Sequence, residues 1–80
     1  MNIRDAQNFS DNVVALLIKE REKQGISRYE LSGRCGLSET ALGYIEKYER
    51  RPTLYTLKMI ADALNVKVFE LIKQIENNKI

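Results

Sequence analysis

Two adjacent arginines, Arg50 and Arg51, are the side chains of this sequence best suited to bind an anion. They stand directly before Pro52, the one proline of the chain, so they should lie in a loop. Guanidinium groups donate charge-assisted hydrogen bonds to phosphate oxygens, often as a paired fork. The sequence therefore predicts a phosphate-binding loop here, which the elements on either side must position.

Other chemistry is poorly supported by the residue types present. The chain has no histidine and one cysteine, Cys35, which rules out a disulfide within one chain and a Cys/His metal site in the monomer. Cys35 falls in an apolar register, and we expect it to be buried and reduced. There is no clustered carboxylate pair and no glycine-rich phosphate loop, and a small core leaves little room for a cleft. We therefore expect no enzyme activity, cofactor, metal or small-molecule ligand.

The overall composition is that of one small soluble domain. The chain has 80 residues, of which 44% are apolar and 30% charged. Valine, isoleucine and threonine are too scattered to form several alternating strands, which favours an all-α fold. The net charge of +2 permits a nucleic-acid partner without arguing for one. The polar N-terminal stretch lacks a signal-peptide core, and no apolar run approaches the roughly 18 residues of a membrane span. We expect a cytoplasmic protein.

The apolar spacing predicts a flexible N-terminal arm over residues 1–9 and a single helical domain over residues 10–80. In the first helix, about 11–24, apolar residues recur three or four positions apart, the mark of an amphipathic helix. Gly25 follows its basic and polar last turn and should end it.

The next two helices carry clear start signals. Ser27 and Glu30 form a capping box, in which each side chain reaches the backbone N–H of the other. Gly36 ends that second helix, and Ser38 caps the third, which covers about 38–47.

A fourth and a fifth helix complete the domain. Thr53 caps the fourth helix. The apolar stripe expected to face inward from it consists of Leu54, Leu57, Ile60, Ala61 and Leu64. Asn65 suits a left-handed turn after that stripe, and the fifth helix should start at about Val68.

The second and third helices are joined by the sequence CGLS, a connection of about three residues. A connection this short forces a sharp crossing of the two helices, which is the geometry of a helix-turn-helix. Leu31 supplies the buried contact, Gly36 the turn, and Leu37 inserts the turn into the core. Together these spacings predict a helix-turn-helix over about 27–47.

The stretch GISRYELSGRCGLSETALGYIEKYERRPTLYTLKMIADALNV resembles the Cro and phage-repressor type of helix-turn-helix domain, also called the xenobiotic-response-element family. The motifs that carry the resemblance are Gly25-Ile26-Ser27, Leu31-Ser32, Gly36-Leu37-Ser38, Ile45-Glu46, Arg50-Arg51-Pro52 and Ile60-Ala61-Asp62-Ala63-Leu64-Asn65-Val66. It covers about residues 10–75 and implies a compact five-helix, lambda-repressor-like domain. The chain departs from the family pattern at Arg28 and Glu39, where glutamine is common, and at Ser32, where alanine is usual.

The resemblance also implies a DNA-binding site, because in this family the second helix of the motif enters the major groove. The residues that it implies for base reading are Glu39, Thr40 and Tyr44, with Ala41 and Gly43 beside them. The residues that it implies for phosphate contacts are Ser27, Arg28, Ser38, Lys47, Arg50 and Arg51. It further implies a partly buried salt bridge between Arg21 and Glu46 that fixes the third helix against the first. The alternative is two separately solvated charges.

The function that the resemblance implies is sequence-specific transcription regulation of prokaryotic or phage type. Such a repressor-like, Cro/C1-type protein would bind palindromic double-stranded DNA as a homodimer. The alternative is a protein-interaction module, such as an antitoxin or an adaptor, that keeps the fold without base reading. The weak net charge, Glu39 and Gly43 keep that alternative open.

Three local questions stay open in the sequence. Glu39 can accept a hydrogen bond from a cytosine amino group, or it can only favour the helix dipole. Tyr48 stands where the family usually has glycine or asparagine. We predict that the third helix continues past Lys47 by about a residue; the alternative is a strained left-handed tyrosine. The apolar face of the fifth helix either closes the core or forms a homodimer seam that also uses Ile80.

Overall fold

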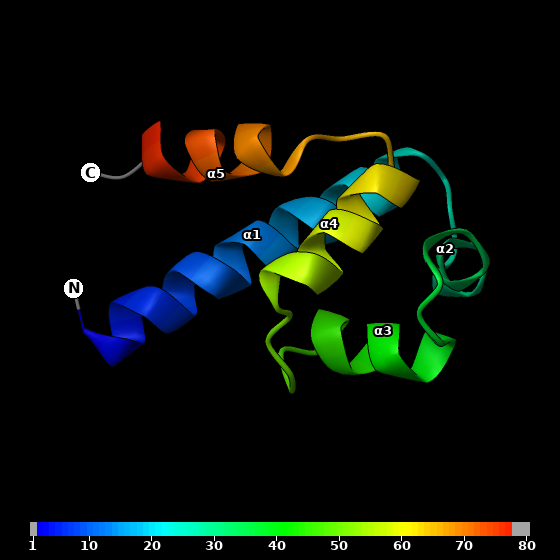
Figure 1. The fold of residues 1–80 in the computed structure, drawn as a ribbon, viewed down its shortest axis with the longest axis horizontal. Coiled ribbons are helices and arrows are strands. Elements are labelled where there is room, and N and C mark those ends of the chain that lie inside the picture. Colours follow the sequence, from blue (N-terminus) through cyan, green and yellow to red (C-terminus); the bar gives the residue numbers. More distant parts are fainter. Residues whose placement is uncertain (1, 78–80) are drawn as a thin grey trace.

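The computed structural model describes residues 2–77, which form five α-helices and no strand (Figure 1). The helices are α1 (Ile3–Lys23), α2 (Arg28–Cys35), α3 (Glu39–Glu46), α4 (Leu54–Ala63) and α5 (Val68–Asn77). α1 runs through the middle of the molecule, with α5 on one side and α3 on the other (Figure 1). This arrangement confirms the predicted all-α, five-helix fold. Within the described part of the chain, no helix has the length and apolar character needed to cross a membrane.

α1 begins at Ile3, well before the predicted start near residue 11, so the prediction of a flexible arm is wrong for residues 3–9. Asn2 caps this end, because its Oδ1 accepts a hydrogen bond of 2.9 Å from the backbone N–H of Asp5. Asp5 also places a negative charge in the first turn, which the helix dipole favours. Residues 2–8 are exposed, so no apolar periodicity marks this part of the helix. Met1 lies outside the described residues.

The hydrophobic core lies where α1 packs against α3 and α5, and where α4 packs against α2 and α5. Its buried side chains are Val13, Val14, Leu17, Ile26, Leu31, Cys35, Leu42, Ile45, Ile60, Ala61, Leu64 and Leu71. Cys35 is a free thiol within this set, as expected. Leu54 was predicted to face inward but is 68% exposed, because the inward stripe of α4 starts one turn later, at Leu57.

α5 closes the core on the side of α1 opposite to α3 (Figure 1). It packs on α1 and α4, with Leu71 buried and with Ile72 and Ile75 partly buried against the core. Phe69, on the same helix, remains exposed. Core closure therefore accounts for most of the apolar face of α5. Ile80, which the dimer alternative would use, lies outside the described residues.

α1, α3 and α4 end in the same left-handed turn. The residue after each C-cap has a positive φ: 71° at Gly25, 61° at Tyr48 and 60° at Asn65. In each turn the N–H of that residue donates to the carbonyl three positions back, and the next N–H donates to the carbonyl five positions back, at 2.9–3.1 Å. These bonds satisfy carbonyls that would otherwise lack partners at the helix ends.

The left-handed conformation of Tyr48 overturns the prediction that α3 continues past Lys47. α3 ends at Glu46, and Lys47 is its C-cap with φ −91°. A non-glycine residue in the left-handed region costs about 1–2 kcal/mol. The turn recovers part of this cost, since it satisfies the carbonyls of Tyr44 and Ile45. Tyr48 as a whole residue is 41% exposed, so the packing of its partly buried side chain offsets some of the rest.

Candidate nucleic-acid interface

α2 and α3 are joined by the short turn that the sequence predicts. Gly36 takes the left-handed conformation with φ 83°, which allows the chain to leave α2 sharply. Leu37 packs against the core, and Ser38 caps α3. Figure 1 views α2 almost end-on and α3 from the side, so the two helices cross steeply. Because α2 also packs against α4, the position of α3 is set by the body of the domain.

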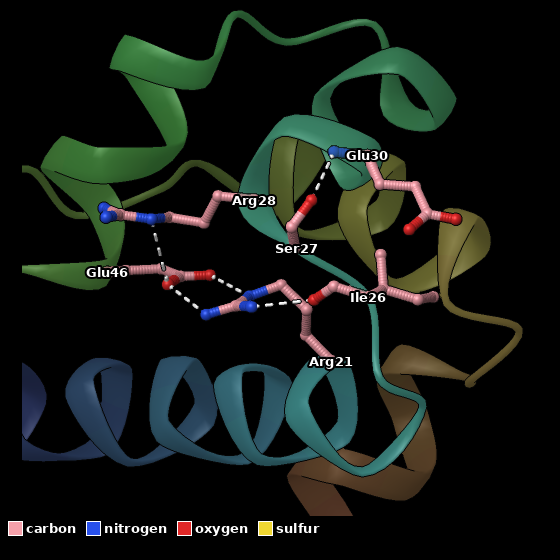
Figure 2. Close-up of polar contacts among 6 residues, drawn as sticks. All are labelled: Arg21, Ile26, Ser27, Arg28, Glu30 and Glu46. Atoms are coloured by element: carbon pink, nitrogen blue, oxygen red, sulfur yellow. Dashed lines mark hydrogen bonds and ion pairs between the residues drawn. The ribbon is translucent and has the colours of Figure 1, made fainter.

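Serine hydroxyls cap both helices of this pair. Ser27 Oγ accepts from the backbone N–H of Glu30, and Ser38 Oγ accepts from that of Ala41, both at 3.0 Å. Figure 2 shows the first of these bonds. The predicted capping box is only half formed, because the Glu30 carboxylate accepts from Arg34 at 2.9 Å, one turn along α2. An exposed acid can reach a guanidinium at this spacing, and the charged partner outcompetes the backbone N–H of Ser27.

A shallow hollow of about 330 Å³ lies on the outer side of α3. It is lined by Arg28, Glu39, Thr40, Gly43, Tyr44 and Lys47. Four of the five residues predicted for base reading therefore surround one depression, together with two residues predicted for phosphate contacts. Ala41 is the fifth base-reading candidate; it is partly buried and does not line the hollow.

Arg28 reaches this hollow from the neighbouring helix. It is the first residue of α2, and its side chain extends toward α3 above Glu46 (Figure 2). Its Nη1 lies 3.2 Å from the place that a Cβ would occupy on Gly43, so the guanidinium covers the glycine and Gly43 is buried. Sequence reasoning missed this contact, since no pattern links positions 28 and 43.

A salt bridge between α1 and α3 lies beneath the hollow. Arg21 Nε and Nη2 donate to the two carboxylate oxygens of Glu46 at 2.8 and 2.9 Å, and Arg21 Nη1 donates to the carbonyl of Ile26 at 2.8 Å (Figure 2). The pKa of Arg21 is raised by its hydrogen bond to Glu46, which outweighs the opposite effect of partial burial. The pair predicted from the family resemblance is therefore present, and it fixes the end of α3 against α1.

The loop after α3 places its two arginines differently. Arg50 lies over the ring of Tyr44, 4.3 Å from guanidinium carbon to ring centroid, and the backbone N–H of Arg50 donates to the backbone carbonyl of Tyr44. Arg51 instead turns toward α1, where its Nη2 lies 3.2 Å from Asp11 Oδ2. Asp11 Oδ1 is buried and has no hydrogen-bond partner among residues 2–77. Sequence reasoning missed this pairing, because nothing in the sequence links Asp11 with a residue 40 positions away.

Comparisons with known proteins agree with this geometry. The sequence model of the Helix-turn-helix family matches residues 17–71, more than half of the chain. An uncharacterized HTH-type transcriptional regulator, y4dJ of Sinorhizobium fredii, is 36% identical over 52 residues, which cover 65% of this chain and 68% of that protein. No solved structure matches the chain. The matched region includes α2, the turn, α3 and the loop that contains Arg50 and Arg51.

Proposed function

The chain belongs to this helix-turn-helix family, and we propose that it is a DNA-binding transcriptional regulator that inserts α3 into the major groove. The observation that carries the proposal is the hollow on α3, where the base-reading candidates gather beside basic side chains. Neither comparison favours the protein-interaction alternative. Both point to a regulator and not to an enzyme.

The base-reading surface consists of Glu39, Thr40 and Tyr44, with Gly43 between their side chains and Ala41 at its edge. The exposed side chains of Glu39, Thr40 and Tyr44 support this assignment, because base edges are read by groups that protrude into the groove. The Glu39 carboxylate can accept from a cytosine amino group, and its place in the first turn of α3 is also favoured by the helix dipole.

Phosphate contacts flank this surface. Ser27 and Ser38 stand at the N-termini of α2 and α3, where free backbone N–H groups favour anions. Lys47 and Arg50 follow α3, and Arg51 lies next in the loop. Such contacts fix the register of the protein on the duplex without reading sequence. Arg28 also carries a positive charge, but its guanidinium lies against Gly43 of α3 and not in the loop after α3.

The regulator is of prokaryotic or phage type, cytoplasmic, and acts as a homodimer on an inverted repeat. Two copies related by a two-fold axis would place their α3 helices in successive major grooves, about 34 Å apart.

In vitro selection of bound duplexes from a random pool tests this function. We expect an inverted repeat to be enriched. The logarithm of the association constant for this repeat should fall linearly with the logarithm of the salt concentration. The salt slope, meaning the gradient of that line, should be about −0.9 for each phosphate neutralised. Failure to retain any duplex at about 50 mM salt would overturn the proposal and favour an interaction module.

A further inference from the structure

Arg28 occupies a different environment from the two arginines of the loop after α3. Arg50 and Arg51 lie in the loop after α3, whereas Arg28 lines the hollow on α3, as Lys47 does. Its guanidinium rests against Gly43, on the same surface as Glu39 and Tyr44. The side chain is 39% exposed, so part of it remains available to a ligand. Position alone therefore groups Arg28 with the base-reading candidates.

The Glu46 carboxylate lies next to the Nε side of the Arg28 guanidinium. Arg28 Nε lies 3.9 Å from Glu46 Oε1 (Figure 2). Glu46 itself is fixed by two hydrogen bonds from Arg21. One carboxylate thus faces two guanidinium groups and compensates only one of their charges, while Lys47 and Glu39, which also line the hollow, carry opposite charges. Nε therefore lies on the side of Glu46, while Nη1 lies against Gly43, which also lines the hollow.

Gly43 provides the space that the guanidinium occupies. Glycine is unfavourable inside a helix, and an alanine methyl at this position would lie 3.2 Å from Arg28 Nη1, closer than an ordinary contact. By contrast, a Cβ added at Gly33, in α2, would meet nothing within 4 Å. The glycine of α3 therefore has a packing consequence that the glycine of α2 lacks, because it leaves room for the guanidinium of an arginine from α2 against α3.

We infer that Arg28 reads a guanine in the major groove across Gly43, so that the base-reading surface includes a residue of α2. This inference rests on the proposed DNA binding. A guanidinium presents paired N–H donors in a fixed fork, which match the O6 and N7 acceptors of guanine. A phosphate contact from the same side chain would carry no sequence information. The two roles therefore predict different results for the same substitution.

The test is selection from a random duplex pool with the wild-type protein and with Arg28→Met and Arg28→Gln. The wild-type half-site should contain a guanine whose replacement weakens binding about 5- to 100-fold. Both variants should lose this discrimination at that base pair and keep the rest of the half-site. Arg34→Met is the matched control: Arg34 is also on α2 but pairs with Glu30, and its loss should leave the selected sequence unchanged.

Three results would overturn the inference in distinguishable ways. If both Arg28 variants enrich the wild-type half-site, bind all duplexes more weakly by one common factor, and lower the salt slope by about one, Arg28 is a phosphate contact. If the variants bind and discriminate as the wild type does, Arg28 has no role in recognition. If the wild type enriches nothing, DNA binding itself fails and this inference fails with it. Circular dichroism melting of each variant establishes that the compared proteins are folded.

Discussion

Arg21 and Glu46, which are 25 residues apart, are joined by two hydrogen bonds of 2.8 and 2.9 Å, and their side chains are only 14% and 13% exposed. Removal of one partner from a largely desolvated pair leaves the other charge without compensation. We expect Arg21→Met to lower the free energy of unfolding by about 3 kcal/mol, measured by urea denaturation. Lys58→Met is the control, because Lys58 and Asp62 are also 2.9 Å apart but 67% and 58% exposed. An equal loss in the two variants would show that burial of the first pair has no energetic effect.

The contribution of this salt bridge to the free energy of unfolding should not depend on pH in the neutral and mildly alkaline range. The hydrogen bond to Glu46 raises the pKa of Arg21, already the most basic kind of side chain. A raised pKa means that the stabilisation is complete below the pKa of arginine in the unfolded chain and is lost only as pH rises through the folded value. The difference in unfolding free energy between wild type and Arg21→Met should therefore be the same at about pH 7 and about pH 10. A decline across that range would assign the stabilisation to another group.

Tyr48→Gly should stabilise the protein. Tyr48 has φ 61° and is 41% exposed, so glycine removes steric strain and loses only the contacts of a side chain that is not fully buried. We expect a gain of about 1 kcal/mol, from a strain of about 1–2 kcal/mol less the larger chain entropy of unfolded glycine. Asn65→Gly is the comparison, because asparagine tolerates a φ of 60° better and should gain less. A lower melting temperature for Tyr48→Gly would mean that contacts of the ring outweigh the strain.

Gly33→Ala should also stabilise the domain, for a different reason. Gly33 lies within α2, is exposed, and has open space where a Cβ would be added. Alanine is favoured over glycine inside a helix by about 1 kcal/mol. Gly36→Ala should have the opposite effect, since Gly36 has φ 83° and a left-handed alanine is strained. Thermal melting of both variants measures the two effects, and a loss of stability in Gly33→Ala would contradict the open geometry.

The sequence predicted those features whose signals lie close together along the chain. The starts of α2, α3 and α4 follow from the caps Ser27, Ser38 and Thr53, each of which accepts a backbone hydrogen bond as expected. The start of α1 was missed because its first turns are exposed and lack apolar periodicity. The left-handed conformation of Tyr48 was expected only as the alternative, because a tyrosine side chain disfavours the conformation that this helix end imposes.

Contacts between distant residues were beyond sequence reasoning unless the family resemblance supplied them. The bridge from Arg21 to Glu46 was expected in that way. The packing of Arg28 on Gly43 and the pairing of Arg51 with Asp11 were not expected, because each depends on how helices approach in space. The roles of these residues in DNA binding stay predictions.

Arg51 is expected to contact phosphate although it also pairs with Asp11 at 3.2 Å. Arg51→Gln should weaken binding to every duplex by a similar factor and reduce the salt slope by about 0.9, because one fewer phosphate is neutralised. Asp11→Asn removes the competing carboxylate, so the slope should stay at least as steep. Lys73→Gln makes the same charge change as Arg51→Gln on α5, across the molecule from α3 (Figure 1), and should barely alter the slope. Fluorescence anisotropy titrations between about 50 and about 200 mM salt measure all three. If Arg51→Gln changes the slope no more than Lys73→Gln does, Arg51 serves only to tie the loop to α1.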